Sequence, residues 1–176
     1  MQAQEKVDIT WSPDIKLTWN DFKGTVDYNS RHSAISNIDI DYQEKKTKDS
    51  VMFTVKCLFS KQLSWVYYAA IESTESDSLL LIHERGHFDI GEIYARKLRK
   101  VLSETHFTND ELLNGKSDVI ADSINKLLMV EQKLYDEETE HGSNKEKQKE
   151  WKNRIAKELL EWEAYRKETV TVFLKR

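Results

Sequence analysis

The stretch DSLLLIHERGHFDIGEIYARKLRKVL, residues 77–102, decides the interpretation of the chain. At about 100° per residue, its apolar residues and two histidines fall in one stripe. That stripe consists of Leu80, His83, His87, Ile90, Tyr94, Leu98 and Val101. A helix running to about Glu104 is therefore predicted, with both histidines facing the interior. Gly86 and Gly91 each cost roughly 1 kcal/mol here relative to alanine, which predicts that something passes close to the helix.

Residues 83–87 of this helix read His-Glu-Arg-Gly-His, an H-E-x-x-H pattern. Two histidines four residues apart can bind one zinc ion, and Glu84 between them can accept a proton from the water that the ion activates. A buried imidazole needs partners for both ring nitrogens, and one ion would satisfy a nitrogen on each ring. The alternative interpretation is a pair of core histidines that are hydrogen-bonded to carboxylates.

The segments around this helix predict an α+β domain in which strands come first and helices after. Residues 1–76 are expected to be mainly β, forming an N-terminal antiparallel sheet, and residues 77–166 mainly α, with three long helices. Residues 167–176 close the chain as a short strand. The strongest strand signal is Val51–Phe59, which is rich in β-branched and aromatic residues. Further expected elements are strands at Val7–Trp11, Ser33–Tyr42 and Thr169–Leu174, and helices at Ser117–His141 and Lys145–Arg166.

Composition limits the classes of function. The 176 residues fit one domain, 1–176, and 39% hydrophobic residues supply a sizeable core. The formal net charge is −4, and basic residues alternate with acidic ones, so we expect no nucleic-acid partner. The single cysteine, Cys57, excludes an internal disulfide and a cysteine-rich zinc cluster, and its apolar surroundings predict a buried, inert thiol.

The sequence also bears on the membrane and the compartment. No stretch reaches the ~18 consecutive apolar residues of a membrane helix, so no membrane span is expected. No signal peptide is present in the sequence as given. The polar opening, Met1–Glu5, is compatible with a mature N-terminus left after signal removal. We therefore expect an extracytoplasmic location, periplasmic or secreted. The oligomeric state is not predicted.

The H-E-x-x-H pattern supplies two ligands, whereas a catalytic zinc ion usually has three protein ligands. No metzincin-type ligand pattern follows His87, so the third ligand must come from farther along the chain. We predict His141, because it lies on the extension of an apolar stripe in the second long helix. That stripe consists of Ile120, Leu127, Val130 and Leu134. Glu138 or Glu137 is the second choice, and Asp136 would point away if the helix is regular to its end.

Several motifs together resemble a bacterial family known as domain of unknown function 922, a group regarded as zinc-dependent proteases of the HExxH, or zincin, peptidase clan. The resemblance covers most of the chain. It is carried by Trp19–Gly24, Ser64–Val66, His83–Ile90, Tyr94–Arg96 and Tyr135–Gly142, followed by Gln148 and Trp151. The family's second signature has the form Y-D-x-x-T-x-H-G, and residues 135–142 match each of its letters.

The resemblance implies a single zincin-like metalloprotease domain with one zinc ion per chain. His83 and His87 would be zinc ligands, Glu84 the general base and His141 the third ligand. The expected activity is hydrolysis of a peptide or protein substrate by a zinc-activated water. The resemblance does not extend to the identity of that substrate.

The resemblance also gives Tyr135 or Asp136 a supporting role, in which either residue holds a ligand or an oxyanion. Regular helical geometry turns these two residues away from His141, so a bend or helix end near residue 140 is then needed. For the oxyanion we consider Tyr135 as a hydrogen-bond donor. An exposed N-terminal strand could hold an extended peptide by edge pairing.

Two other functions remain open at this point. In the first, the protein is a non-catalytic zinc-binding or protein-interaction domain, in which the tryptophans and long helices form a partner surface. The presence of Glu84 argues against a purely structural zinc site, since a closed site needs no base. In the second, the protein is a metal hydrolase that acts on a non-peptide amide, such as a cell-wall linkage.

Overall fold

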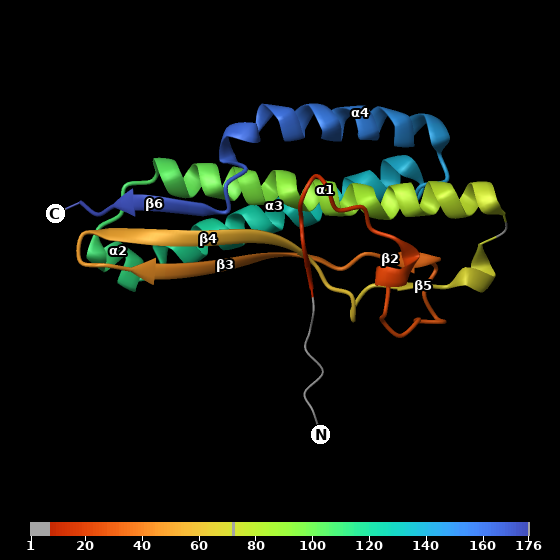
Figure 1. Ribbon diagram of the computed structural model, residues 1–176, viewed down its shortest axis with the longest axis horizontal. Coiled ribbons are helices and arrows are strands. Elements are labelled where there is room, and N and C mark those ends of the chain that lie inside the picture. The colour runs from red at the N-terminus through yellow and green to blue at the C-terminus, as the bar shows by residue number, and fades with distance from the viewer. Residues whose placement is uncertain (1–7, 72, 176) are drawn as a thin grey trace, which may run out of the picture.

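A computed structural model describes residues 8–71 and 73–175 (Figure 1). Its strands are β1 (Ile9–Thr10), β2 (Ala34–Ile35), β3 (Ile38–Lys46), β4 (Ser50–Phe59), β5 (Trp65–Val66) and β6 (Thr169–Phe173). Its α-helices are α1 (Thr74–Glu104), α2 (Asn109–Leu113), α3 (Lys116–Thr139) and α4 (Lys145–Glu161). Short 3-10 turns occur at Trp19–Asp21, Tyr68–Ala70 and Glu163–Tyr165. The predicted α+β fold, with antiparallel strands, three long helices and a closing strand, is confirmed.

Strand β4 is the centre of the larger sheet. It pairs with β3 on one edge, from Ile38 opposite Phe59 to Lys46 opposite Val51. Its other edge pairs with β1 at one end and with β6 at the other. Every second residue of β4 is buried, because alternate side chains of a strand point to opposite faces and one face lies on the core. A separate pair, β2 and β5, forms a small second sheet.

Helix α1 crosses the molecule and covers the buried face of this sheet (Figure 1). Gly91 permits the contact, because a Cβ there would lie 2.5 Å from Ile38 Cγ2 and 2.7 Å from Cys57 Sγ. Cys57 is fully buried, as predicted, and burial raises the pKa of its thiol well above the ordinary value. The predicted close approach to the helix is therefore confirmed at both glycines. The sheet packs closely against Gly91, and Tyr135 of α3 packs closely against Gly86.

A buried group of charges stabilises the second half of α1. The Glu92 carboxylate accepts hydrogen bonds from Arg96 Nε at 2.9 Å and from Arg99 Nη1 at 2.8 Å. All three side chains are almost completely buried. Arg99 also donates to the backbone carbonyl of Val55 in β4 and to that of Tyr165 ahead of β6. These charges therefore connect α1 to the sheet and to the C-terminal segment.

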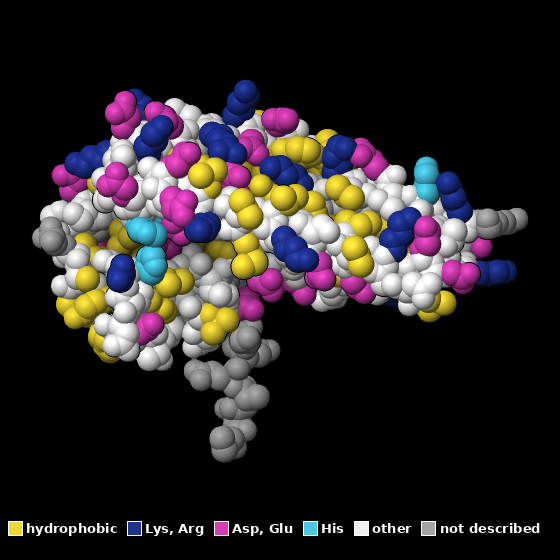
Figure 2. Space-filling model, turned by 180° about the vertical axis from the view of Figure 1, so that it is seen from behind, with side chains coloured by type: hydrophobic (Ala, Val, Ile, Leu, Met, Phe, Trp, Pro, Cys, Tyr) yellow, Lys and Arg dark blue, Asp and Glu magenta, His cyan; other side chains and the backbone are white. Residues whose placement is uncertain are grey.

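Helix α3 buries a different face from the one predicted. Leu127, Val130 and Leu134, expected in the core, have exposed fractions of 54%, 65% and 36%. The buried face instead carries Ser117, Ala121, Ile124, Leu128, Tyr135 and Thr139. Figure 2 shows hydrophobic side chains along the middle of one face of the molecule. The prediction was wrong because the face of α3 turned to α1 includes polar residues that contact the histidines of α1.

Other helix ends differ by a few residues from the predicted ones. Helix α1 begins at Thr74, after Ser73, whose side chain accepts from the backbone N–H of Ser76. Helix α4 ends at Glu161 and is followed by a 3-10 turn. The expected polar leader, Met1–Glu5, and the start of the first predicted strand lie outside the described residues. Among the helices of the described residues, none is long and apolar enough to cross a membrane.

Candidate metal centre

Helix α1 brings the two histidines of the H-E-x-x-H pattern together in its first half. His83 is 1% exposed and His87 is 9% exposed. Their rings meet edge to face, with 4.6 Å between the ring centroids and 3.1 Å between the two Nε2 atoms. The predicted interior position of both side chains is confirmed. The shared direction of the two Nε2 atoms follows from the i, i+4 spacing on one helix face.

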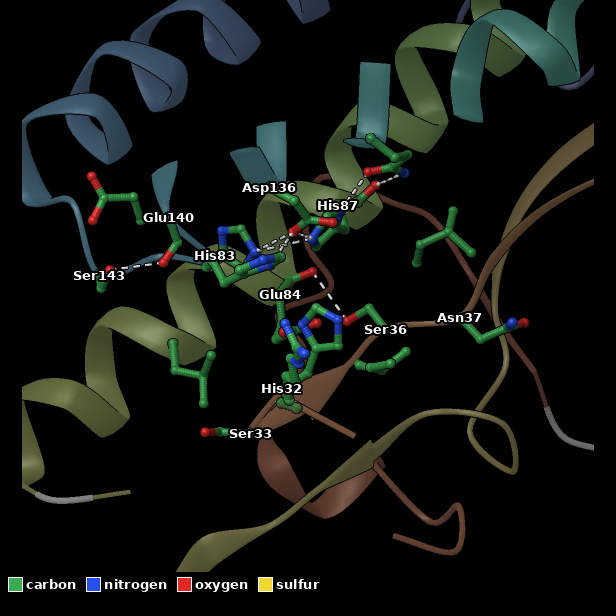
Figure 3. Close-up of a pocket in the computed structure, with 17 residues that line it drawn as sticks. His32, Ser33, Ser36, Asn37, His83, Glu84, His87, Asp136, Glu140 and Ser143 are labelled. Carbon is green, nitrogen blue, oxygen red and sulfur yellow. Dashed lines mark hydrogen bonds and ion pairs between the residues drawn. The ribbon is translucent and has the colours of Figure 1, made fainter. Parts of the chain in front are cut away.

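Asp136, in the last turn of α3, faces both rings. Its Oδ1 lies 3.0 Å from His83 Nε2 and 3.0 Å from His87 Nε2 (Figure 3). The predicted orientation of Asp136, away from the site, is wrong, because the face of α3 that packs on α1 is the one that carries Gln132, Asp136 and Thr139. The three atoms form a nearly equilateral triangle with sides of 3.0 to 3.1 Å.

His141 lies just beyond the end of α3 and approaches the same carboxylate. The helix stops at Thr139, and the backbone of Glu140 and His141 is left-handed, with φ values of 50° and 53°. The helix end required near residue 140 is therefore present, but His141 is not on a helical stripe. Its Nδ1 lies 3.3 Å from Asp136 Oδ1, and its side chain is 52% exposed.

The remaining candidates lie outside this triangle. Glu138 accepts a hydrogen bond from Trp151 Nε1 at 2.8 Å and does not line the cavity. Glu137 is exposed and pairs with Lys133. Tyr135 is completely buried, and its ring stacks on His83 with 4.5 Å between centroids. Its hydroxyl donates to the His83 backbone carbonyl, so its position fits support of a ligand better than donation to an oxyanion.

Gln132 of α3 sets the tautomer of His87. The backbone carbonyl of His87 can only accept, so the atom of the Gln132 amide that contacts it at 2.9 Å must be the donor Nε2. The other amide atom, Oε1, then faces His87 Nδ1 and can only accept. His87 Nδ1 therefore carries a proton, and in the neutral ring the lone pair is on Nε2.

A similar chain of hydrogen bonds sets the tautomer of His83. The Tyr135 hydroxyl donates to the His83 carbonyl, so it must accept from Gln148 Nε2. Gln148 Oε1 then faces His83 Nδ1 at 3.2 Å as an acceptor. Thr139 agrees independently: its hydroxyl donates to the Tyr135 carbonyl at 2.6 Å and accepts at 3.3 Å from His83 Nδ1. His83 Nδ1 therefore carries a proton too, which leaves its lone pair on Nε2.

The inner face of the cluster thus consists of acceptors. Two neutral imidazole lone pairs and a carboxylate oxygen lie about 3 Å apart, and such a group needs a cation among its members, either bound protons or a metal ion. Burial raises the pKa of Asp136, but when the cation is a proton on a histidine Nε2 the resulting hydrogen bonds and positive charge outweigh burial and leave the pKa below its usual 3.8. Burial lowers the pKa of His87, whereas Asp136 and Glu84 raise it to a net value above 6.5.

Glu84 adds a carboxylate on the cavity side of the cluster. It is 3% exposed, and its Oε2 is buried without a hydrogen-bond partner among the described residues. It lines a cavity of about 520 Å³ together with the two histidines, Asp136 and residues 31–38. Figure 3 shows Glu84 and His32 on one side of the cluster, and Figure 2 shows histidine rings at the surface beside a hollow.

Four residues contribute to the site in roles that the sequence did not predict, although Thr139 and Gln148 belong to the motifs that carry the family resemblance. They are Gln132, Thr139 and Gln148, which contact the Nδ1 atoms, and His32, whose ring lies edge to face with His141 at 4.5 Å between centroids. Gln132, Asp136 and Thr139 follow each other at i, i+4 and i+7, so they share one helix face. That polar periodicity was the available signal, since it predicts a polar face that contacts the two histidines.

The geometry defines an α+β protein with a candidate metal centre between two helices, made of two histidines and a carboxylate. Residues 62–142 match the family model described as a bacterial protein of unknown function (DUF922). The matched range contains His83, Glu84, His87, Asp136 and His141. The resemblance to this family is confirmed over that range, which is less than half of the chain rather than most of it. The zinc protease activity attributed to the family stays a prediction. No curated protein and no solved structure matches the chain.

Proposed function

We propose that the protein is a zinc-dependent hydrolase that cleaves peptide bonds. One zinc ion per chain would be held by His83 and His87 together with a residue from the end of α3. The observation that carries the proposal is the convergence of two imidazole lone pairs and one carboxylate oxygen at about 3 Å, with both outer ring nitrogens already bound to amide oxygens. Metal-binding histidines in proteins are usually held in this way by partners on the second ring nitrogen.

The donor set fits zinc in type and spacing. Zinc binds imidazole nitrogen and carboxylate oxygen at about 2.0–2.2 Å in a tetrahedral arrangement, which separates neighbouring ligand atoms by roughly 3.3 Å. The three atoms of the cluster lie 3.0 to 3.1 Å apart. Small movements of these side chains would therefore suffice to place all three around one ion.

Glu84 is the proposed general base. When bound, zinc supplies Lewis-acid chemistry, since it lowers the pKa of water toward ~7 and polarises a carbonyl group. The Glu84 carboxylate has a buried oxygen with no partner among the described residues, which is costly in a folded protein unless the group serves a ligand or substrate. From this position Glu84 would accept the proton of the attacking water and pass it to the leaving amine.

The cavity suits an extended peptide. Strand β2 pairs only with β5 among the described strands, so no described strand occupies its second edge. Ala34 and Ile35 of β2 line the same cavity as the two histidines. A peptide could therefore add to the β2 edge through main-chain hydrogen bonds and pass in front of Glu84.

A non-catalytic interaction domain is the main competing function. It would use the tryptophans as a partner surface, but all five tryptophans are buried or half-buried. Two of them donate indole hydrogen bonds to Asp89 and Asp77 of α1, which gives them a structural role. A hydrolase of a non-peptide amide would use the same residues, so only substrate assays separate it from a peptidase. The extracytoplasmic location stays a prediction.

Metal content and hydrolysis test the proposal in sequence. The wild-type chain, purified with zinc supplied, should hold about one zinc ion per chain. His87→Ala should lose it, and Glu84→Gln, which keeps both imidazoles, should retain it. An unfolded protein substrate should be cleaved by the wild type and not by Glu84→Gln. A wild-type chain that binds no zinc would contradict the proposal, and equal cleavage by Glu84→Gln would contradict the role of Glu84.

A further inference from the structure

We infer that Asp136 is the third protein ligand of this metal and that His141 is a fourth, displaceable group that closes the site. The inference rests on the proposed function, because it concerns how the same ion is held and exposed. The sequence favoured His141 as third ligand and had Asp136 pointing away. The positions of the two side chains support the opposite assignment.

Asp136 is placed as a fixed ligand. Its Oδ1 is equally distant, at 3.0 Å, from both histidine Nε2 atoms. It belongs to the last turn of α3, and its neighbours on that face, Gln132 and Thr139, contact the rings of His87 and His83. The carboxylate is therefore held in register with both imidazoles by the packing of α3 on α1 rather than by a loop.

His141 is held more loosely at the same place. Its imidazole is about half exposed, and its one polar contact with the cluster is the 3.3 Å approach of Nδ1 to Asp136 Oδ1. Its ligand atom lies within 4.8 Å of those of His83 and Asp136, near enough for a side-chain rotation to bring it to a shared ion. Moving an exposed ring costs little desolvation, so His141 can approach or leave more easily than a buried ligand.

The backbone at His141 is held by contacts that do not involve its ring. The His141 N–H donates to the Asp136 carbonyl at 2.9 Å, which closes the helix end. Gly142 follows with φ of 85°, and a Cβ there would lie 2.8 Å from His83 Cβ, so this turn is packed against a proposed ligand. In the inferred arrangement, rotation of the His141 side chain alone, away from or toward the ring of His32, would bring the imidazole to the ion or remove it.

Such a rotation would give the centre two forms. With His141 as a ligand, four protein groups would hold the ion, as in closed zinc sites. With His141 turned away, His83, His87 and Asp136 would hold it, and the ion would be accessible from the cavity that Glu84 lines. A substrate in the cavity would contact His32 and His141 at the surface, so its binding could favour the open form.

Cobalt(II) tests the assignment without measuring hydrolysis. Affinity is measured by competition with a chelator, and coordination by the visible absorption of the cobalt-substituted protein. Asp136→Asn should weaken binding by roughly 100-fold or more, beyond the 10–100-fold typical of outer partners. His141→Ala should weaken it less than about tenfold, change the cobalt spectrum and let added azide bind. Glu137→Gln, an exposed neighbour, is the control and should match the wild type.

Failure of the inference and failure of the proposed function give different results. If the wild type binds neither cobalt nor zinc, the proposed function falls and the inference falls with it. If the wild type binds metal, but His141→Ala loses it while Asp136→Asn keeps it, the inference is overturned and the metal centre stands. Asp136→Glu, which retains a carboxylate, guards against misfolding. It should bind cobalt with an altered spectrum, and a spectrum identical to wild type would count against Asp136 as a ligand.

Discussion

Gln132 contacts His87 at two points, donating from Nε2 to its backbone carbonyl and accepting at Oε1 from its ring Nδ1. One amide from α3 thus fixes the ring of a residue on α1 relative to that residue's own backbone. The arrangement sets both the direction of the ring and the position of its proton. It is a property of the pair of helices, because neither helix alone supplies both groups.

The Gln132 contact predicts a loss of metal affinity without loss of a ligand. Gln132→Ala should lower zinc affinity by about 10–100-fold, since the ring of His87 loses its orienting acceptor. Competition with a chromogenic chelator measures the change. Lys133→Ala, at a neighbouring exposed position, is the control and should bind zinc like the wild type. Unchanged affinity in Gln132→Ala would show that the contact does not prepare the ring for metal.

Gly86 predicts a packing defect that depends on Tyr135. A Cβ at Gly86 would lie 2.8 Å from Tyr135 Cζ, so Gly86→Ala should destabilise the fold by about 1–3 kcal/mol despite the better helix propensity of alanine. Urea unfolding gives the change in free energy. In the Tyr135→Leu background, the same substitution should cost less, because the ring that it meets is gone. Additive effects would contradict a direct clash.

Glu92 predicts a large effect on stability that is independent of metal. Glu92→Gln should lower the free energy of unfolding by about 3–5 kcal/mol, because two buried guanidinium groups lose their shared carboxylate. Glu137→Gln is the matched control: its ion pair with Lys133 is exposed, so the change should stay within about 1 kcal/mol. Chelator should leave the difference between the two variants unchanged in urea titrations.

The histidine–carboxylate cluster predicts a pH-dependent stability for the metal-free protein. The folded pKa of His87 lies above 6.5, so its contribution is present below that pH and is lost as the pH rises through the folded value. The folded pKa of Asp136 lies below 3.8, so its contribution is present above that pH and is lost as the pH falls through the folded value. The cluster should therefore stabilise the metal-free fold most between pH 3.8 and 6.5.

Thermal unfolding at a series of pH values tests this dependence. With chelator present, the midpoint should fall as the pH rises through the folded pKa of His87, and excess zinc should reduce that fall, since the ion replaces the protons. His87→Gln should lose most of the dependence in that range. A wild-type midpoint that does not change with pH in chelator would mean that His87 is not charged in the metal-free fold.

Much of the fold could be predicted from local patterns. The alternation in β4 was read correctly, and so was the stripe on α1 from His83 to Leu98, because in both cases one face is buried against the core. Val101, predicted at the end of that stripe, is 36% exposed, so the stripe was wrong there. Helix α3 was read on the wrong face. Its exposed leucines resembled a core stripe, while the polar side chains that it buries are hydrogen-bonded to α1. Some polar helix faces are buried because a neighbouring helix supplies their hydrogen-bond partners. In a single sequence, such a face has the same pattern as a solvent-exposed one.

The candidate site was predictable on α1 and only partly predictable beyond it. The i, i+4 spacing of His83 and His87 determines their neighbourhood, so both were placed correctly. The orientation of Asp136 depends on how α3 is rotated against α1, which is a tertiary property. The place of His141 depends on two successive left-handed residues, for which Gly142 was the one local sign.

The late position of β6 in the chain affects how the protein can be assembled. Until Thr169–Phe173 has been synthesised, the Ser50–Thr54 segment of β4 has an open edge that can pair with another chain. The carbonyl at Tyr165 that receives Arg99 is also made late. A chain truncated before residue 165 would still contain every residue of the candidate metal centre. Without β6, however, the Ser50–Thr54 edge of β4 would be unpaired and could pair with another chain. Aggregation of such a fragment would therefore reflect the missing sheet edge rather than a defect in the centre.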